Sequence, residues 1–202
     1  MKMFLAVLLA MGLFSGIATA NKTVVEKLPA PQRSGGMALM DALNKRASIK
    51  EFAKKDIDKQ TLSDILWAAY GVNRPNGKRT IPTSRGKNDL DVYVAKSDGV
   101  WFYDANENSL KLVLAENILF RFNNQDYMKD VPIILFYTGS KNNAEPAMHA
   151  GSAFQNVGLY SASKGLNNVV RGNFDKAKTH KLLSLSADKE VIISQVVGWG
   201  KQ

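Results

Sequence analysis

Residues 145–164 constrain the fold of this chain most, because apolar or small side chains occupy almost every side of the stretch. Pro146 suits the first turn of a helix, where its missing N–H costs nothing, and Gly165 suits the position just past the end. A helix with this composition lies inside a domain, with neighbours packed closely against it. We therefore expect a central buried helix, a short strand over residues 167–170, and a turn at Arg171 and Gly172 that forms the floor of a ligand site.

The remaining pattern predicts an α+β domain. Apolar residues recur at intervals of three and four over residues 58–70, which indicates an amphipathic helix that ends at Gly71. We expect further helices over residues 37–45, 116–129 and 175–183, and strands over residues 90–96, 100–103, 110–113, 133–138 and 191–198. This order of elements predicts a small mixed, mainly antiparallel sheet wrapped by helices. A chain of 202 residues is long enough for one such domain, predicted at residues 37–202 after an extended lead-in over 21–36.

The first twenty residues have the pattern of a secretory signal peptide. Lys2 precedes an apolar run over residues 3–14, and Ala18-Thr19-Ala20 forms an A-x-A cleavage site. No later segment is long and apolar enough to span a membrane, and the chain has no cysteine to form a disulfide or a thiol nucleophile. We therefore expect a mature protein that begins near Asn21 and is periplasmic or secreted.

The charge and the motif content exclude several function classes. The net charge is +9, but the Lys and Arg residues are spread along the chain, which favours a phosphate-bearing ligand over nucleic acid. The sequence lacks a G-x-G-x-x-G motif, a P-loop and a G-x-S-x-G elbow. His149 and His180 do not have zinc-ligand spacing. We interpret His149 as a buried structural histidine and His180 as a solvated one.

Two basic segments could contact a ligand. In an extended segment over residues 46–52, alternate side chains share a face, so Arg46, Ser48 and Lys50 would point the same way. Two cations and a hydroxyl on one face suit a phosphate and a polyol, although a solvated edge strand is the favoured interpretation of this segment when it is taken alone. Residues 73–88 form a second polar, basic loop, for which ligand binding and simple solubility both remain open.

These motifs together resemble one family. The residues that carry the resemblance are Arg46-x-Ser48-x-Lys50-x-Phe52, the sequence LWAAYG at residues 66–71, RTIPTS at residues 79–84, and the stretches 99–104, 130–135 and 149–175. In order and spacing they resemble the FMN-dependent nitroreductase superfamily, and more closely its branch of SagB-like azoline oxidases. The resemblance covers most of residues 37–200.

The resemblance implies a binding site for FMN. It places Arg46, Ser48 and Lys50 on the phosphate and ribityl chain, and a guanidinium is well suited to a phosphate. It places Pro82, Thr83, Ser84 and Asn88 along the flavin ring, and a backbone N–H of Arg171 or Gly172 at the ring nitrogen that accepts hydride. Three departures from the family pattern occur. Lys201 alone can replace the usual C-terminal basic pair, the usual A-P-S is shifted in I-P-T-S, and Arg171 replaces a common acidic residue.

The resemblance also implies partners and a reaction. Family members are intertwined homodimers with each flavin at the interface, NAD(P)H as the transient electron donor and a quinone or nitro compound as the small-molecule acceptor. The cofactor carries the chemistry, so no side chain is expected to be catalytic. Two alternatives remain: an azoline dehydrogenase that acts on a peptide, and a non-enzymatic protein that binds a phosphate-bearing ligand on the same fold.

Overall fold

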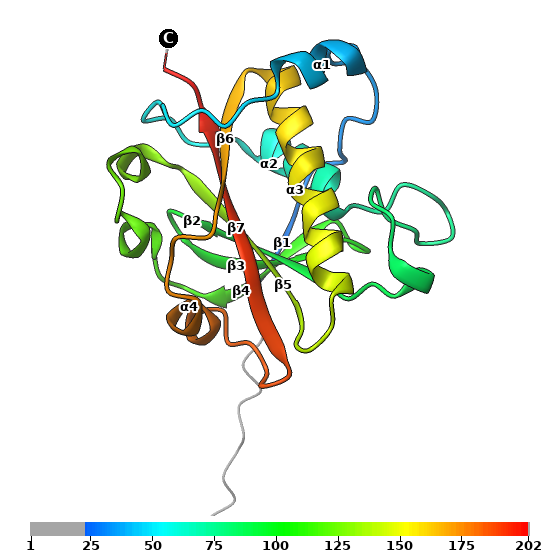
Figure 1. The fold of residues 1–202 in the computed structure, drawn as a ribbon, viewed down its shortest axis with the longest axis vertical. Helices are drawn as coiled ribbons and strands as arrows, with labels where there is room; N and C mark the ends of the chain where they lie inside the picture. Colours follow the sequence, from blue (N-terminus) through cyan, green and yellow to red (C-terminus); the bar gives the residue numbers. More distant parts are fainter. Residues whose placement is uncertain (1–22, 202) are drawn as a thin grey trace, which may run out of the picture.

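A computed structural model describes residues 23–201, and the predicted signal peptide lies outside the described residues. Seven antiparallel strands form one sheet in the order β1-β4-β3-β2-β5-β7-β6 (Figure 1). The strands are β1 (Val25–Lys27), β2 (Leu90–Lys96), β3 (Gly99–Asp104), β4 (Ser109–Leu114), β5 (Ile133–Ser140), β6 (Leu166–Arg171) and β7 (Lys189–Trp199). The helices are α1 (Leu39–Lys45), α2 (Lys59–Tyr70), α3 (Glu145–Lys164) and α4 (Lys176–Leu182).

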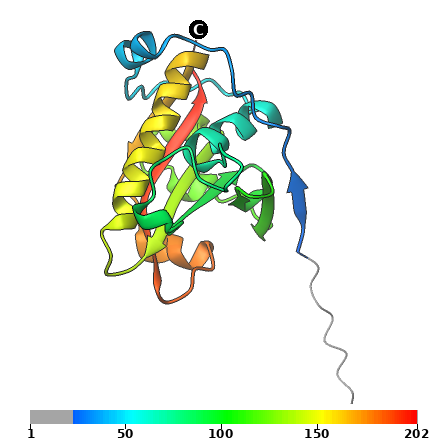
Figure 2. The same ribbon diagram turned by 90° about the vertical axis from the view of Figure 1, so that its right-hand side faces the viewer.

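The predicted central helix is confirmed. Helix α3 spans all twenty residues of the stretch 145–164 and crosses one face of the sheet, with α1 and α2 packed against it (Figures 1 and 2). Pro146 lies in its first turn, and Gly165 ends it in the left-handed conformation, with φ of 73°. The predicted helix over residues 58–70 is also confirmed as α2, whose N-cap Asp58 accepts a hydrogen bond from the Thr61 N–H.

The sheet is buried on both faces. One apolar cluster fills the space between the sheet and helices α2 and α3, and a second lies on the opposite face beneath residues 118–131 and α4. Strand β5 is at the centre, with every residue from 133 to 139 buried, as its continuous apolar run predicts. The α+β class is therefore confirmed.

The predicted mixture of parallel and antiparallel strands is wrong for the described residues. All pairings among them are antiparallel. The connection β5–α3–β6 does return the chain in a parallel direction, but β7 inserts between these two strands and pairs with both of them. The sequence could not indicate this insertion because β7 is the last strand of the chain.

A second prediction, a helix over residues 116–129, is also wrong. Two short 3-10 helices, η2 (Leu119–Phe122) and η3 (Asp126–Asp130), occupy this stretch. Asn117 accepts a hydrogen bond from the Leu119 N–H through its side chain, a local bond that competes with the first turn of an α-helix. Ile118 and Phe122 are nevertheless buried in the second cluster, so their apolar character reflects the core and not a helix.

The N-terminal lead-in is tied to the sheet. Its residues 25–27 form β1, which pairs with β4 at the edge opposite β6. Within residues 23–201, no helix combines the length and the apolar character that crossing a bilayer requires.

Candidate functional site

The edge strand β6 organises most of the predicted site residues. The segment after α1 runs beside it, because the Ile49 N–H donates to the Asn168 carbonyl at 3.2 Å and the Asn167 amide donates to the Glu51 carbonyl at 2.6 Å. The Ala53 N–H then donates to the Trp199 carbonyl at 2.8 Å, at the end of β7. These bonds place Arg46, Ser48 and Lys50 along the first half of β6, in a segment without regular secondary structure.

Arg46 lies on the C-terminal half of α3. A methyl group built at Gly158 would lie 3.4 Å from Arg46 Cγ and 3.5 Å from Arg46 Cδ, so the glycine leaves just enough room for the arginine stem. Arg46 is half-buried, whereas Ser48 and Lys50 are exposed. No carboxylate in residues 23–201 pairs with Arg46 or Lys50.

Lys50 and Lys201 both lie against η3. The Lys50 ammonium is 5.5 Å from the ring centroid of Tyr127, and the Lys201 ammonium is 4.0 Å from an Asp130 carboxylate oxygen. The fold therefore brings the C-terminal lysine, the lysine of the first motif and η3 to the same end of β6 and β7. The sequence did not indicate this arrangement, because residues 116–129 were predicted to form one α-helix.

Arg171 and Gly172 lie at the other end of β6. The four residues from Asn168 to Gly172 cover about 14 Å of extended chain, a separation similar to that between the phosphate and the ring of a flavin mononucleotide. Backbone groups of alternate residues in an antiparallel strand point to the same side. The Asn168 carbonyl points away from β7, towards Ile49. Residue 172 is four positions further along, so its N–H is expected to point to the same side, away from β7. A methyl group built at Gly172 meets no atom within 4 Å, which leaves its backbone open to approach.

The Arg171 side chain, in contrast, is buried against the segment that contains η2 and η3. Only 3 % of the residue is exposed. Its Nη2 donates to Asn124 Oδ1 at 2.6 Å and to the Asn173 carbonyl at 3.0 Å. Arg171 is therefore not an arginine that reaches into solvent for a ligand, and the backbone at this turn is the part that a ligand can meet directly.

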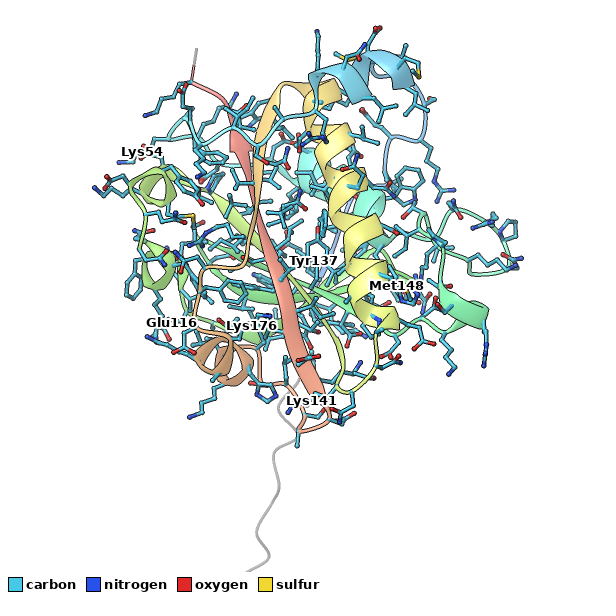
Figure 3. All side chains as sticks on the ribbon, in the orientation of Figure 1. Lys54, Glu116, Tyr137, Lys141, Met148 and Lys176 are labelled. Atoms are coloured by element: carbon cyan, nitrogen blue, oxygen red, sulfur yellow. The ribbon has the colours of Figure 1, made fainter. Side chains whose placement is uncertain are left out.

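A network of hydrogen bonds through buried side-chain amides connects β6 to β5, β7 and α3. The Tyr137 hydroxyl donates to Gln195 Oε1 at 2.7 Å, and Gln195 Nε2 donates to Asn168 Oδ1 at 3.0 Å and to the Phe154 carbonyl at 3.1 Å. Burial raises the pKa of Tyr137, so the hydroxyl remains a donor. Figure 3 shows Tyr137 in the middle of the molecule, whereas Lys54 and Lys141 lie at its periphery. The network fixes β6 to α3 and β7.

The predicted ring-lining loop lies elsewhere in the chain. The Ser84 N–H donates to His149 Nε2 at 3.0 Å, which fixes the loop to the N-terminal half of α3, while Arg46 packs on the C-terminal half. Pro82 and Asn88 are exposed, and Thr83 and Ser84 are half-buried. Within one chain these four residues make no hydrogen bond or ion pair with the residues along β6. The predicted site residues therefore form two separate groups.

Sequence reasoning missed three residues that position these groups. His149 is buried as predicted, but it also holds the 82–84 loop. Asn124 and Tyr127 lie between the two ends of β6, where they contact Arg171 and Lys50. The cluster of Asn residues at 117, 123 and 124 was the available signal, because consecutive Asn residues are typical of turns.

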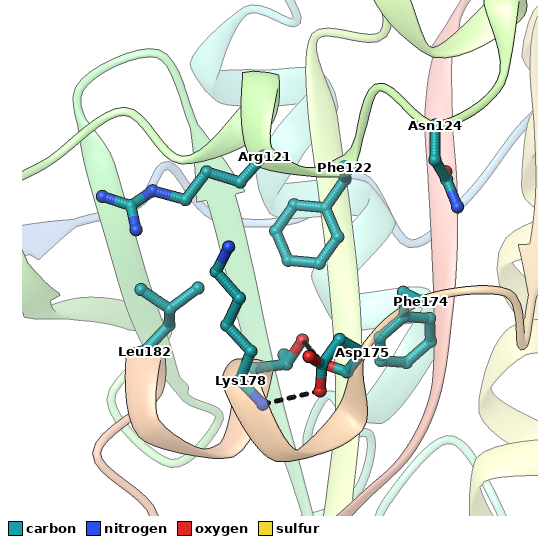
Figure 4. A pocket seen from close by; sticks show the side chains of 8 residues that line it. Arg121, Phe122, Asn124, Phe174, Asp175, Lys178 and Leu182 are labelled. Carbon is teal, nitrogen blue, oxygen red and sulfur yellow. Dashed lines mark hydrogen bonds between the residues drawn. The ribbon is translucent and has the colours of Figure 1, made fainter.

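A cavity of about 230 Å³ opens beside this region, between η2 and α4 (Figure 4). Phe122 and Phe174 form aromatic walls, and the Asp175 carboxylate caps α4 by accepting from the Lys178 N–H at 2.9 Å. Asn124, which also lines it, connects the cavity to Arg171. No group of three or more potential metal ligands from His, Asp and Glu occurs in the part of the chain that the structure describes.

Comparisons with known proteins agree with this geometry. A profile of the nitroreductase family matches residues 43–199. A candidate nitroreductase of Ralstonia eutropha JMP134 is similar in structure, with 35 % sequence identity, a TM-score of 0.82, and coverage of 88 % of this chain and 90 % of that one. A candidate nitroreductase of Methanocaldococcus jannaschii is 28 % identical over 73 % of this chain and 84 % of its own length.

More distant structures share the fold alone. A candidate nitroreductase of Desulfovibrio desulfuricans, solved in complex with FMN, has 16 % identity and a TM-score of 0.61, and the match covers 83 % of this chain and 89 % of that one. A chain of the Escherichia coli microcin synthetase complex has 18 % identity and a TM-score of 0.67, over 98 % of this chain and 85 % of that one. The family profile and the Ralstonia relative establish that this chain belongs to the nitroreductase family and is an oxidoreductase of that type.

Proposed function

We propose that the chain forms a homodimer that binds FMN and transfers two electrons from NAD(P)H to a quinone or nitro-type small molecule. The observation that carries this proposal is the arrangement along β6. Arg46 and Lys50, which have no carboxylate partner among residues 23–201, lie at one end of the strand, and an open glycine turn lies at the other, about one flavin length away. The FMN complex of the Desulfovibrio relative supports the same choice of cofactor.

The residues present fit such a cofactor. Arg46, Ser48 and Lys50 offer two charges and a hydroxyl to a phosphate and a polyol chain, and Lys201 adds a third charge at the same end. The Gly172 N–H continues the outward series of backbone groups on β6 and offers a donor to a ring nitrogen. When bound, FMN supplies the hydride and electron transfer between donor and acceptor. The protein holds the phosphate, orients the ring and shields it from water.

Support for the dimer comes from the predicted ring-lining residues 82–84, which do not lie beside β6 in the same chain. The ring-lining group at residues 82–84 is fixed to the N-terminal half of α3, away from Arg46, and we propose that a second copy of the chain supplies it to the site. An apolar surface suits such a contact: Leu39, Met40, Leu43 and Ile49 are all exposed on and just after α1. We infer that this surface contributes to the interface and that both protomers build each site.

A second candidate is an azoline dehydrogenase that acts on a peptide. Its specific support is the fold shared with a chain of the microcin synthetase complex, which was solved with truncated pro-MccB17 bound. We further propose that residues 1–20 export the protein to the periplasm, so that a donor other than NAD(P)H remains an outcome of the test. A protein that takes no FMN would instead act as a binder of another phosphate-bearing ligand.

The decisive experiment uses the purified protein with added FMN. We expect a yellow 1:1 complex per protomer in a dimer by size-exclusion chromatography, and loss of the flavin colour on addition of NADH or NADPH under nitrogen. Colour that persists with both nucleotides but fades with a thiazoline peptide would select the azoline dehydrogenase. A colourless protein would refute both redox functions.

The variant Arg46→Ala tests the site itself. Loss of a charge-assisted phosphate contact costs about 1.5–3 kcal/mol, which weakens FMN binding about tenfold to a hundredfold. Lys181→Ala is the control, because it removes one exposed positive charge on α4 away from β6. Equal FMN affinities in both variants would remove Arg46 from the site.

A further inference from the structure

Arg171 carries a charge for which residues 23–201 provide no counter-ion. The side chain is almost wholly buried, and its Nε and Nη1 atoms have no hydrogen-bond partner in the part of the chain that the structure describes. Its Nη2 donates only to neutral oxygens, those of Asn124 and Asn173. No carboxylate of residues 23–201 lies within 4 Å of the guanidinium.

Burial of this kind is unfavourable unless something offsets it. Loss of solvation lowers the pKa of Arg171, yet a guanidinium stays protonated at neutral pH. Elsewhere the chain compensates its partly buried cations: the ammonium of Lys189 lies 2.8 Å from Asp91 and 3.7 Å from Asp89. Arg79 is the other buried arginine without a carboxylate, and its guanidinium lies 4.8 Å over the ring of Tyr70. Arg171 has no carboxylate partner among residues 23–201; the nearby Tyr127 hydroxyl favours the charged form of the guanidinium but supplies no full counter-charge.

A purely structural role does not require the charge. The two bonds from Arg171 Nη2 fix β6 to the segment that contains η2 and η3, but both acceptors are neutral oxygens, which an uncharged N–H donor satisfies equally well. The positive charge itself is therefore not needed for the packing of Arg171. It lies beside the turn at Gly172, because Arg171 Nη2 donates to the carbonyl of the next residue, Asn173, at 3.0 Å, and under the proposed function the ring of the cofactor would lie at this turn.

We propose that Arg171 supplies the fixed positive charge that makes the site bind reduced FMN more tightly than oxidised FMN. This inference rests on the proposed function. A hydride brings two electrons and one proton to the flavin ring and leaves the nicotinamide oxidised, so the ring gains one negative charge. A buried cation preorganised at the ring attracts that charge without rearrangement. Arg171 thereby acts through its field, as a residue that sets the midpoint potential of the bound cofactor.

The expected effect is measurable. At a separation of about 10 Å and an effective dielectric constant of about 20, the attraction between two unit charges changes an affinity by about tenfold. For a two-electron couple, a tenfold change in the ratio of the two dissociation constants shifts the midpoint potential by about 30 mV. Removing the charge should therefore lower the potential by about this amount and leave the affinity for oxidised FMN within about twofold.

The test compares Arg171→Gln, Arg171→Lys and Arg121→Gln with the wild type. Each dimer is loaded with FMN, the dissociation constant for oxidised FMN is measured by fluorescence titration, and the potential by anaerobic titration against a reference dye. We expect the lower potential in Arg171→Gln and a nearly native potential in Arg171→Lys. Arg121→Gln should keep the native potential, because Arg121 lies in the same region but already pairs with Glu116.

Two results would overturn the inference. Equal weakening of oxidised and reduced FMN in Arg171→Gln, with an unchanged potential, would make Arg171 a structural clamp. An equal drop of the midpoint potential in Arg121→Gln would show that the effect comes from the net charge of the protein and not from the position of Arg171. A wild-type protein that binds no FMN would refute the proposed function together with this inference, whereas a normal FMN complex with an unshifted Arg171→Gln refutes the inference alone.

Discussion

Two glycines of α3 allow the position of Arg46 to be tested without changing Arg46. Gly158 and Gly151 both lie inside the helix, where replacing glycine with alanine stabilises a protein by about 1 kcal/mol. They differ in what the added methyl group meets. At Gly151 the nearest atom is at the far end of the Phe154 ring, 3.9 Å away, an ordinary contact. At Gly158 the methyl group would lie 3.4 Å and 3.5 Å from two carbons of the Arg46 stem.

The expected results follow from these contacts. Gly151→Ala should raise the melting temperature by about 2–4 °C, the shift that 1 kcal/mol produces in a domain of this size. Gly158→Ala should raise it by somewhat less, because its methyl group meets the arginine stem at 3.4 and 3.5 Å, the short end of ordinary van der Waals contact. Only Gly158→Ala should weaken FMN binding, by up to the roughly 1.5–3 kcal/mol that a charged phosphate contact contributes. Calorimetry and fluorescence titration of the two variants provide both quantities.

One combination of results would refute the reasoning. Suppose that Gly158→Ala binds FMN as tightly as Gly151→Ala, whereas Arg46→Ala loses more than tenfold in affinity for FMN. Arg46 would then contact the phosphate in a position that does not depend on its packing against α3. If all three variants bind FMN like the wild type, the phosphate lies elsewhere.

Three further predictions concern residues that hold the site or the fold. Ser84→Ala keeps the backbone N–H that bonds to His149, so it should alter FMN binding and leave the dimer intact by light scattering, whereas His149→Leu removes the acceptor and should cost about 1–3 kcal/mol of stability in a denaturant titration. Tyr137→Phe should cost a similar amount of stability, because it removes the hydroxyl that donates to the buried Gln195 Oε1. Tyr93→Phe is its control, because the Tyr93 hydroxyl has no protein partner in residues 23–201. Equal stabilities of the two variants would contradict the network. The Thr61 N–H lowers the pKa of Asp58, so Asp58→Ala should cost about 1 kcal/mol at pH 7. This deficit should begin to shrink below about pH 4 and decrease further as the pH falls through the lowered pKa of Asp58, because the wild-type cap loses its charge there. A constant deficit in thermal melts from about pH 7 down to about pH 2 would show that the charge contributes nothing.

Local signals in the sequence predicted much of this fold. Pro146, Gly165 and the apolar surround specified α3 to the residue, because each acts through conformational preferences of its own backbone. The period of α2 and the apolar run of β5 were equally informative. Residues 116–129 misled because their apolar positions serve the core at irregular spacing, while Asn117 closes a local turn that favours a 3-10 helix.

The site was less accessible to such reasoning because it depends on contacts between distant segments. The outward series of backbone groups exists only because β6 is at an edge and the segment that contains Ile49 covers half of it. Neither fact is encoded near residue 171. The same holds for the Arg171 side chain: its substitution for the common acidic residue was visible in the sequence, but its burial without a counter-ion was not.

The separation of the two residue groups is itself informative about assembly. His149 fixes the 82–84 loop to one half of α3, and Gly158 seats Arg46 on the other half, nine residues or about 13 Å further along the helix. A rigid helix cannot bring both groups onto one small ligand within a single chain. Either only one group binds the cofactor, or a second α3 runs beside the first so that the loop of one protomer meets the arginine of the other. The second arrangement predicts that the Arg46→Ala and the Ser84→Ala homodimers both bind FMN weakly, whereas a mixed dimer of the two chains keeps one unaltered site. The first predicts that only one of the two homodimers binds FMN weakly.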